Sequence, residues 1–150
     1  MATTAVEPVF VDTNLLVYAK QALSPFNAQA TAKLKELAAA GHALWISRQI
    51  LREYLVTMSH PAALTGPVPM TSLVADVQGF ERQFIMAEDG PAVTAQLFRL
   101  LTTIQVAGKQ VHDANIVATM LGHGIPRLVT HNVTDFNRYA SHITVIPLVP

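Results

Sequence analysis

VFVDTNLLVYA (residues 9–19) joins a short apolar run to a second apolar run through an acidic residue. Residues 9–11 predict a buried strand, and the residues from Thr13 onward predict a helix that begins directly after it. Asp12 is therefore expected at the carboxyl end of the strand. In open parallel α/β sheets, ligands bind at this edge, where strand ends and helix starts leave backbone donors unpaired. The alternative is that Asp12, Thr13 or Asn14 only caps the helix.

Outward from this stretch, strand and helix signals alternate along the chain. The predicted strands are residues 43–47, 84–88, 127–132 and 143–148, and the predicted helices are residues 27–41, 48–58, 70–82, 91–108 and 111–124. Such alternation is typical of an α/β fold, here a single three-layer α/β/α domain over residues 1–150 with a mostly parallel central sheet. Right-handed crossovers then bring the carboxyl ends of all strands to one edge.

Two of the predicted helices carry specific expectations. One face of helix 27–41 is apolar and is expected to be buried through Ala30, Leu34, Leu37 and Ala38. Gly122 and Gly124 are expected to end helix 111–124, because glycine is common just after the last helical residue.

The composition narrows the classes of protein that fit the chain. With 51% hydrophobic and 13% charged residues, 150 residues are enough for one well-packed core. The absence of cysteine excludes disulfides and thiolate metal sites and predicts a cytoplasmic location. We expect no signal peptide and no membrane span, since no apolar run approaches roughly 20 residues. The positive mean hydropathy predicts an apolar surface that pairs two copies in a homodimer.

Four acidic residues occupy comparable places in the predicted strand–helix units. Asp12 ends the first strand, Glu53 lies about one turn past the second, Asp113 begins a helix and Asp135 follows the fourth strand. Carboxylates that converge raise one another's pKa values, so such a cluster requires a cation or protons. Oxygen ligands without cysteine indicate Mg²⁺ or Mn²⁺. Such an ion activates water for attack on a phosphodiester, which makes the four acids candidate catalytic and metal-binding residues.

The charge balance is compatible with a substrate that carries phosphates. The formal net charge is zero, which argues against a generic nucleic-acid coat with its strong basic excess. If the four acids share one pocket, the rest of the chain holds 10 basic residues against the remaining 6 of its 10 acidic residues. A metal-filled acidic pocket on a mildly basic body would accept a phosphate backbone.

Several polar, basic and aromatic residues near the acids are candidates for a supporting role. The hydroxyl and amide side chains either orient the carboxylates and metal-bound water or form only caps and strand-end hydrogen bonds; they are Thr13, Asn14, Thr130 and Asn132. His112 and His131 can contact phosphates. So can several cations, unless they form only a solvated surface: Arg48, Arg52, Lys109, Arg127 and Arg138. Three aromatic residues either stack on bases or pack in the core: Tyr18, Tyr54 and Phe136.

Four motifs together resemble those of the PIN-domain ribonucleases, especially the VapC-type toxins of bacterial toxin–antitoxin pairs. They are VDTNLLVYA, ISRQILREYL, VHDANIVATM and LVTHNVTDF, and the resemblance extends from Val9 to about Val145. It implies a PIN-like α/β/α fold, a Mg²⁺- or Mn²⁺-dependent endoribonuclease activity on RNA, dimerisation and inhibition by a small antitoxin protein. It also implies that Asp12, Glu53 and Asp113 are metal-site acids, with Asp135 the fourth.

One departure from the family leaves the fourth acid open. Many members have an acid directly after the threonine of the fourth strand, whereas this chain has His131 and Asn132 after Thr130. An amide oxygen can bind a hard cation but adds no charge, so either Asn132 or Asp135 faces the ion. Two other hypotheses stay open beside the nuclease: a phosphoacceptor-type signalling domain, and a catalytically weakened PIN-fold binding module.

Overall fold

The computed structural model describes residues 5–64 and 66–150. Strand β1 (Val9–Val11) is fully buried and leads through Asp12 into helix α1 (Thr13–Lys20), as predicted. Asp12 is the N-cap of α1, and its Oδ1 accepts a hydrogen bond from the main-chain N–H of Thr13 at 2.8 Å. The capping expected from the sequence is therefore confirmed for Asp12, and it is compatible with a second role at the strand edge.

The central sheet contains five described strands, all parallel. Beside β1 lie β2 (Leu44–Ile46), β3 (Ile85–Met86), β4 (Arg127–Thr130) and β5 (Thr144–Pro147), in the order β3-β2-β1-β4-β5. Each neighbouring pair is parallel, so the carboxyl ends lie at one edge of the sheet. Because β1 is the central strand, Asp12 lies in the middle of that edge.

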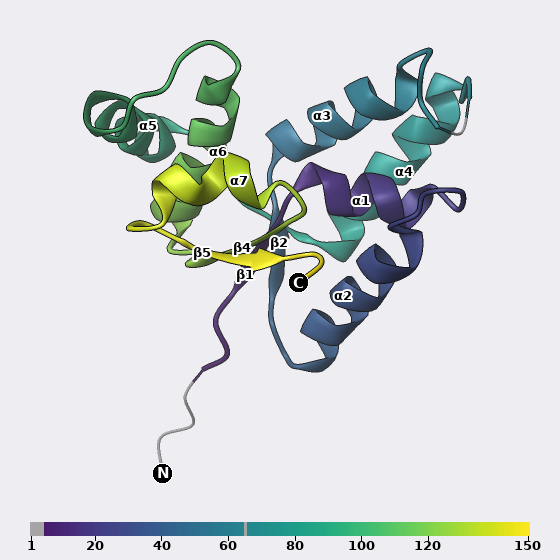
Figure 1. Ribbon diagram of the computed structural model, residues 1–150, viewed down its shortest axis with the longest axis horizontal. Coiled ribbons are helices and arrows are strands. Elements are labelled where there is room, and N and C mark those ends of the chain that lie inside the picture. Colours follow the sequence, from purple (N-terminus) through teal and green to yellow (C-terminus); the bar gives the residue numbers. More distant parts are fainter. Residues whose placement is uncertain (1–4, 65) are drawn as a thin grey trace.

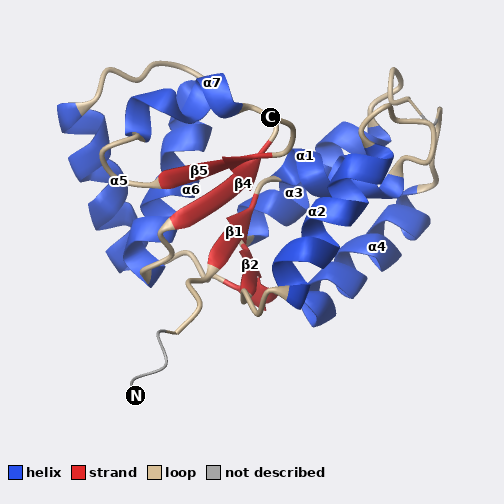
Figure 2. Ribbon diagram, turned by 60° about the horizontal axis from the view of Figure 1, so that its bottom comes forward, coloured by secondary structure: helices blue, strands red, loops and turns tan. Residues whose placement is uncertain are grey.

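Helices cover both faces of the sheet, α1 to α4 on one side and α5 to α7 on the other (Figures 1 and 2). The three-layer α/β/α fold predicted from the sequence is thus confirmed. None of the helices within the described ranges combines the length and apolar character needed to cross a membrane. The bounds of the remaining helices are α2 Asn27–Ala39, α3 Arg48–Ser59, α4 Met70–Gln83, α5 Pro91–Thr103, α6 Gln110–His123, α7 Val133–Phe136 and a 3₁₀ turn Asn137–Tyr139.

Several element ends differ from the prediction: β3 is limited to Ile85–Met86 rather than residues 84–88, α2 ends at Ala39 rather than at residue 41, and α5 and β4 also end earlier. Helix α5 ends at Thr103 rather than at residue 108, because Ile104 adopts an extended conformation after a run of β-branched residues that disfavours helix. Strand β4 ends at Thr130 rather than at residue 132. The chain turns toward α7 at this point, and the main-chain N–H of Asn132 donates to Thr130 Oγ1 at 3.0 Å.

The predicted role of Gly122 as a helix end is wrong, whereas that of Gly124 is confirmed. Gly124 ends α6 in the left-handed conformation, with φ 68°. Gly122 lies inside α6, where an added Cβ would come within 3.2 Å of Val93 Cγ2 on α5. The glycine therefore allows α5 and α6 to pack closely, which sequence spacing alone does not distinguish from a helix stop.

Helix α2 presents a narrower face to the core than predicted. Ala30 and Leu37 are buried and Leu34 packs against the core, but Ala38 is exposed. The helix packs mainly against α1 at the margin of the layer, so only a thin stripe of its surface is covered.

Candidate active site

The pairing of β1 with β4 places Asp12 beside Thr130. Val11 is in register with Val129, and the main-chain N–H of Asp12 donates to the Val129 carbonyl at 3.1 Å. The buried Thr130 hydroxyl donates to Asp12 Oδ2 at 2.7 Å. Asn14 Nδ2 donates to the same carboxylate oxygen at 3.2 Å and to Thr130 Oγ1 at 3.2 Å. Thr130 and Asn14 thus fix the orientation of the Asp12 carboxylate.

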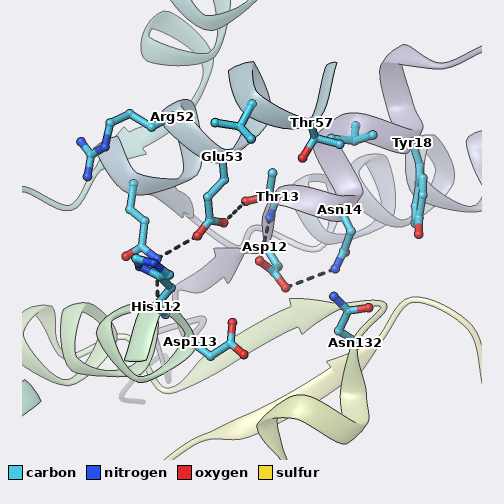
Figure 3. Close-up of a pocket in the computed structure, with 13 residues that line it drawn as sticks. Asp12, Thr13, Asn14, Tyr18, Arg52, Glu53, Thr57, His112, Asp113 and Asn132 are labelled. Atoms are coloured by element: carbon cyan, nitrogen blue, oxygen red, sulfur yellow. Dashed lines mark hydrogen bonds between the residues drawn. The ribbon is translucent and has the colours of Figure 1, made fainter. Parts of the chain in front are cut away.

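A pocket of about 640 Å³ opens at this edge of the sheet. Asp12 from the end of β1, Glu53 from α3 and Asp113 from the first turn of α6 all line it (Figure 3). Three acids that lie 41 and 60 residues apart along the chain are therefore brought to one cavity. Six other candidates from the sequence line the same pocket: Thr13, Asn14, Tyr18, Arg52, His112 and Asn132.

The Glu53 carboxylate is held at both of its oxygens. The Thr13 hydroxyl donates to Oε2 at 2.7 Å, and Gln49 Nε2 donates to Oε1 at 2.9 Å. The interpretation of the sequence missed Gln49. A signal was present, because Gln49 precedes Glu53 by four residues and therefore lies on the same face of α3.

The fourth acid lies outside the pocket. Asp135 on α7 is exposed and does not line the pocket, whereas Asn132, the residue before α7, does. Asp135 is nevertheless close enough for its negative charge to raise the pKa of Asp113. The structure therefore places Asn132 at the cavity and Asp135 within electrostatic range of it.

Two of the pocket carboxyls, those of Asp12 and Asp113, have pKa values above the ordinary range. Burial raises the pKa of Asp12 from 3.8 to about 6, hydrogen bonds from Thr130 and Thr13 oppose the rise, and the charges of Glu53 and Asp113 add to it. Burial also raises the pKa of Asp113 to about 6, followed by the charges of Asp135 and Glu53. Carboxyls shifted in this direction are stabilised by a proton or by a bound cation.

The chemistry of the donor set fits a hard divalent cation. The acids of the pocket offer only oxygen ligands, and in the described part of the chain none of them forms an ion pair with a basic side chain. No three His, Asp or Glu side chains among the described residues are gathered closely enough to ligate one ion directly. Mg²⁺ does not require such a cluster, because it commonly keeps several waters and binds one or two carboxylates directly.

The chain is similar in sequence to a known ribonuclease. Ribonuclease VapC24 of Mycobacterium tuberculosis (strain ATCC 25618 / H37Rv) is 25% identical over 131 residues, which cover 86% of this chain and 89% of the relative. No protein-family model matches the chain.

Solved structures show the same architecture. A chain in the crystal structure of VapBC2 from Rickettsia felis, bound to a DNA fragment from their promoter, matches with a TM-score of 0.70 and 18% identity, covering 93% of this chain and 97% of that chain. The Sarcin-Ricin loop cleaving toxin VapC20 of Mycobacterium tuberculosis matches with a TM-score of 0.63 and 17% identity, covering 91% and 96%. The chain has the VapC fold. The predicted resemblance to VapC-type PIN-domain ribonucleases is thereby confirmed.

Within this VapC-like fold, the candidate cations separate into those at the pocket and those held elsewhere. Arg52 is exposed and lines the pocket. Arg48 is paired with Glu81 and Glu88, and Arg127 is paired with Glu7, so neither arginine lines the pocket. Lys109 and Arg138 are exposed and do not line it either.

The candidate aromatic and histidine contacts separate in the same way. Tyr18 lines the pocket, whereas Tyr54 and Phe136 are buried, so their stacking on bases is excluded and the alternative of core packing is correct. His131 does not line the pocket and packs its ring against Tyr18 and Phe26 instead, with centroid separations of 5.6 and 4.4 Å. Tyr18 is therefore the candidate at the cavity.

The raised pKa of Asp12 predicts that stability falls as the pH rises. The folded state binds the proton more tightly than the unfolded state, so Asp12 lowers the free energy of unfolding progressively between pH 3.8 and about pH 6. A rise of this size corresponds to roughly 3 kcal/mol. Urea denaturation of the wild-type protein and of Asp12→Asn, in the presence of a chelator and at a series of pH values, measures this contribution to the free energy of unfolding. We expect the decline to be smaller in the variant; parallel curves for the two proteins would contradict the shift.

Proposed function

We propose that this protein is a Mg²⁺- or Mn²⁺-dependent endoribonuclease, acting as a single PIN-like domain over residues 1–150. The observation that carries the proposal is the meeting of Asp12, Glu53 and Asp113 in one pocket without a basic partner among the described residues. The similarity to ribonuclease VapC24 and the fold shared with an RNA-cleaving toxin support the same activity.

The residues of the pocket have different roles in the proposed RNA hydrolysis. Asp12, Glu53 and Asp113 would hold the ion directly or through water, Asn132 would offer an amide oxygen, and Asp135 would contribute negative charge from outside the pocket. When bound, the ion lowers the pKa of a water and stabilises charge on the phosphate. Thr13, Asn14 and Thr130 keep the carboxylates oriented through their hydrogen bonds.

The proposed biological role is that of the toxin in a toxin–antitoxin pair. The structures of similar fold include VapBC toxin–antitoxin complexes, so we infer a small antitoxin protein as the partner. Exposed apolar side chains such as Leu23 and Val56 are compatible with the predicted homodimer and with a protein partner. An RNA substrate is consistent with a cytoplasmic location.

Incubation of purified protein with a structured RNA tests the proposed activity. We expect cleavage with Mn²⁺ or Mg²⁺, loss of cleavage with a chelator, and recovery when excess ion is restored. Asp12→Asn, purified in parallel, should not cleave, because the buried carboxylate at the end of β1 is lost. Equal cleavage by wild type and variant, or by wild type with and without chelator, would refute the metal-dependent site.

Replacing Arg52 by alanine is expected to weaken RNA binding more than the chemical step. Arg52 is exposed at the pocket and forms no ion pair within the described ranges, so it is free to contact a phosphate. We expect KM to rise by roughly threefold to tenfold with kcat nearly unchanged, and the salt dependence of binding to fall by about one phosphate contact. Arg82→Ala, an exposed arginine on α4, serves as the matched control. Equal effects of both variants would assign Arg52 to general surface charge.

A further inference from the structure

Gln49 links the two helices that carry Glu53 and Asp113. Its side-chain nitrogen donates to Glu53 Oε1 at 2.9 Å and to the main-chain oxygen of His112, the residue before Asp113, also at 2.9 Å. Gln49 and Glu53 lie on α3, whereas His112 and Asp113 lie on α6, which belongs to the helix group on the other face of the sheet (Figure 1). One largely buried amide in the wall of the pocket therefore connects the helix of Glu53 to the helix of Asp113.

The orientation of this amide is fixed by its partners. A main-chain carbonyl and an ionised carboxylate can only accept hydrogen bonds, so the nitrogen of Gln49 has to face both His112 and Glu53. The Gln49 oxygen then faces Asn115, whose Nδ2 donates to it at 2.8 Å. The opposite orientation of Gln49 would set its oxygen against two acceptors. Asn115 therefore locks Gln49 in the only arrangement that satisfies all three hydrogen bonds.

We propose that Gln49, locked by Asn115, is a positioning residue that sets the place of Glu53 relative to Asp113 in the ion site. This inference rests on the proposed metal-dependent ribonuclease function. Thr13 holds the other oxygen of Glu53 from α1, so without Gln49 the carboxylate keeps one anchor and can turn about it. The link between α3 and the main chain next to Asp113 is lost at the same time.

Gln49→Met tests the role with a side chain of similar length that makes none of these hydrogen bonds. We expect kcat to fall by about 10- to 100-fold, the range seen when residues that orient metal ligands are replaced. The KM for RNA should stay within roughly threefold, because Gln49 is buried and acts through Glu53. Mn²⁺ affinity, measured by calorimetry without RNA, should weaken by about tenfold.

Asn115 provides a test that a merely structural role would not pass. Asn115→Leu should lower kcat and Mn²⁺ affinity in the wild-type background and have little further effect in the Gln49→Met background, because Asn115 acts through Gln49. Gln78→Met, an exposed glutamine on α4, is the matched control and should leave both quantities unchanged. Additive losses from the two substitutions would overturn the proposed lock.

The outcomes separate this inference from the function on which it rests. Wild-type cleavage and Mn²⁺ binding together with an unchanged Gln49→Met variant would overturn the positioning role and leave the nuclease intact. A wild-type protein that neither binds Mn²⁺ nor cleaves RNA would overturn both. A fall in kcat of Gln49→Met that is accompanied by a loss of thermal stability, with unchanged Mn²⁺ affinity in the folded protein, would also overturn the positioning role.

Discussion

Asp113→Asn is expected to abolish RNA cleavage while leaving the protein as stable as before, or more stable, at neutral pH. Asp113 lies in the first turn of α6 and points its carboxylate into the pocket beside Asp12 and Glu53 (Figure 3). Neutralising it removes one of the charges proposed to hold the ion, so kcat should fall by at least about 100-fold. Burial and the charges of Asp135 and Glu53 disfavour the ionised form, so its removal relieves a cost of folding.

The two expected effects have opposite signs, which separates a functional acid from a structural one. Urea denaturation at pH 7 in chelator measures stability, and initial rates of RNA cleavage with saturating Mn²⁺ measure activity. Asp89→Asn is the matched control, since Asp89 is exposed and does not line the pocket, and it should change neither quantity. An Asp113→Asn protein that cleaves at the wild-type rate would remove Asp113 from the proposed site.

The sheet was predictable because buried parallel strands leave strong local signals. Residues 9–11 and 44–46 are apolar runs, residues 127–130 contain the apolar pair Leu128 and Val129, and polar residues and a helix follow each strand. Helix interiors and ends were less predictable, because they depend on neighbours that sequence spacing does not reveal. Gly122 looks like a helix stop, yet it lies inside α6 because Val93 of α5 packs against it.

The three acids of the pocket were predictable because each belongs to a strand–helix unit: Asp12 follows the end of β1, Glu53 lies in the helix after β2, and Asp113 lies in the first turn of α6. Topology brings such positions to one edge whatever the details of packing. The position of Asp135 was not predictable, since it depends on where β4 ends and α7 begins: Asn132 is the residue before α7, whereas Asp135 lies within that helix. Gln49 was missed for a related reason: its importance lies in contacts with α6, more than 60 residues away in the chain.

Phe136→Ala is expected to be the most destabilising of the substitutions considered, lowering the free energy of unfolding by about 3–5 kcal/mol. Helix α7 has only four residues, so its own hydrogen bonds cannot hold it in place. Phe136 is buried at 1% exposure and packs against Tyr139, with ring centroids 6.3 Å apart, while α7 rests on β5. Truncation leaves a cavity beneath the helix and removes its anchor.

Removal of the Phe136 ring should also change the pocket. Asn132 and Asp135 flank or lie on α7, so a detached helix would move both away from Asp113. We therefore expect weaker Mn²⁺ binding in Phe136→Ala even at temperatures where the protein remains folded. Phe98→Ala on α5 is the matched control, because that ring is 61% exposed and its removal should change stability by less than about 0.5 kcal/mol. Urea denaturation at equal protein concentrations compares the two, and similar losses would show that burial of Phe136 does not anchor α7.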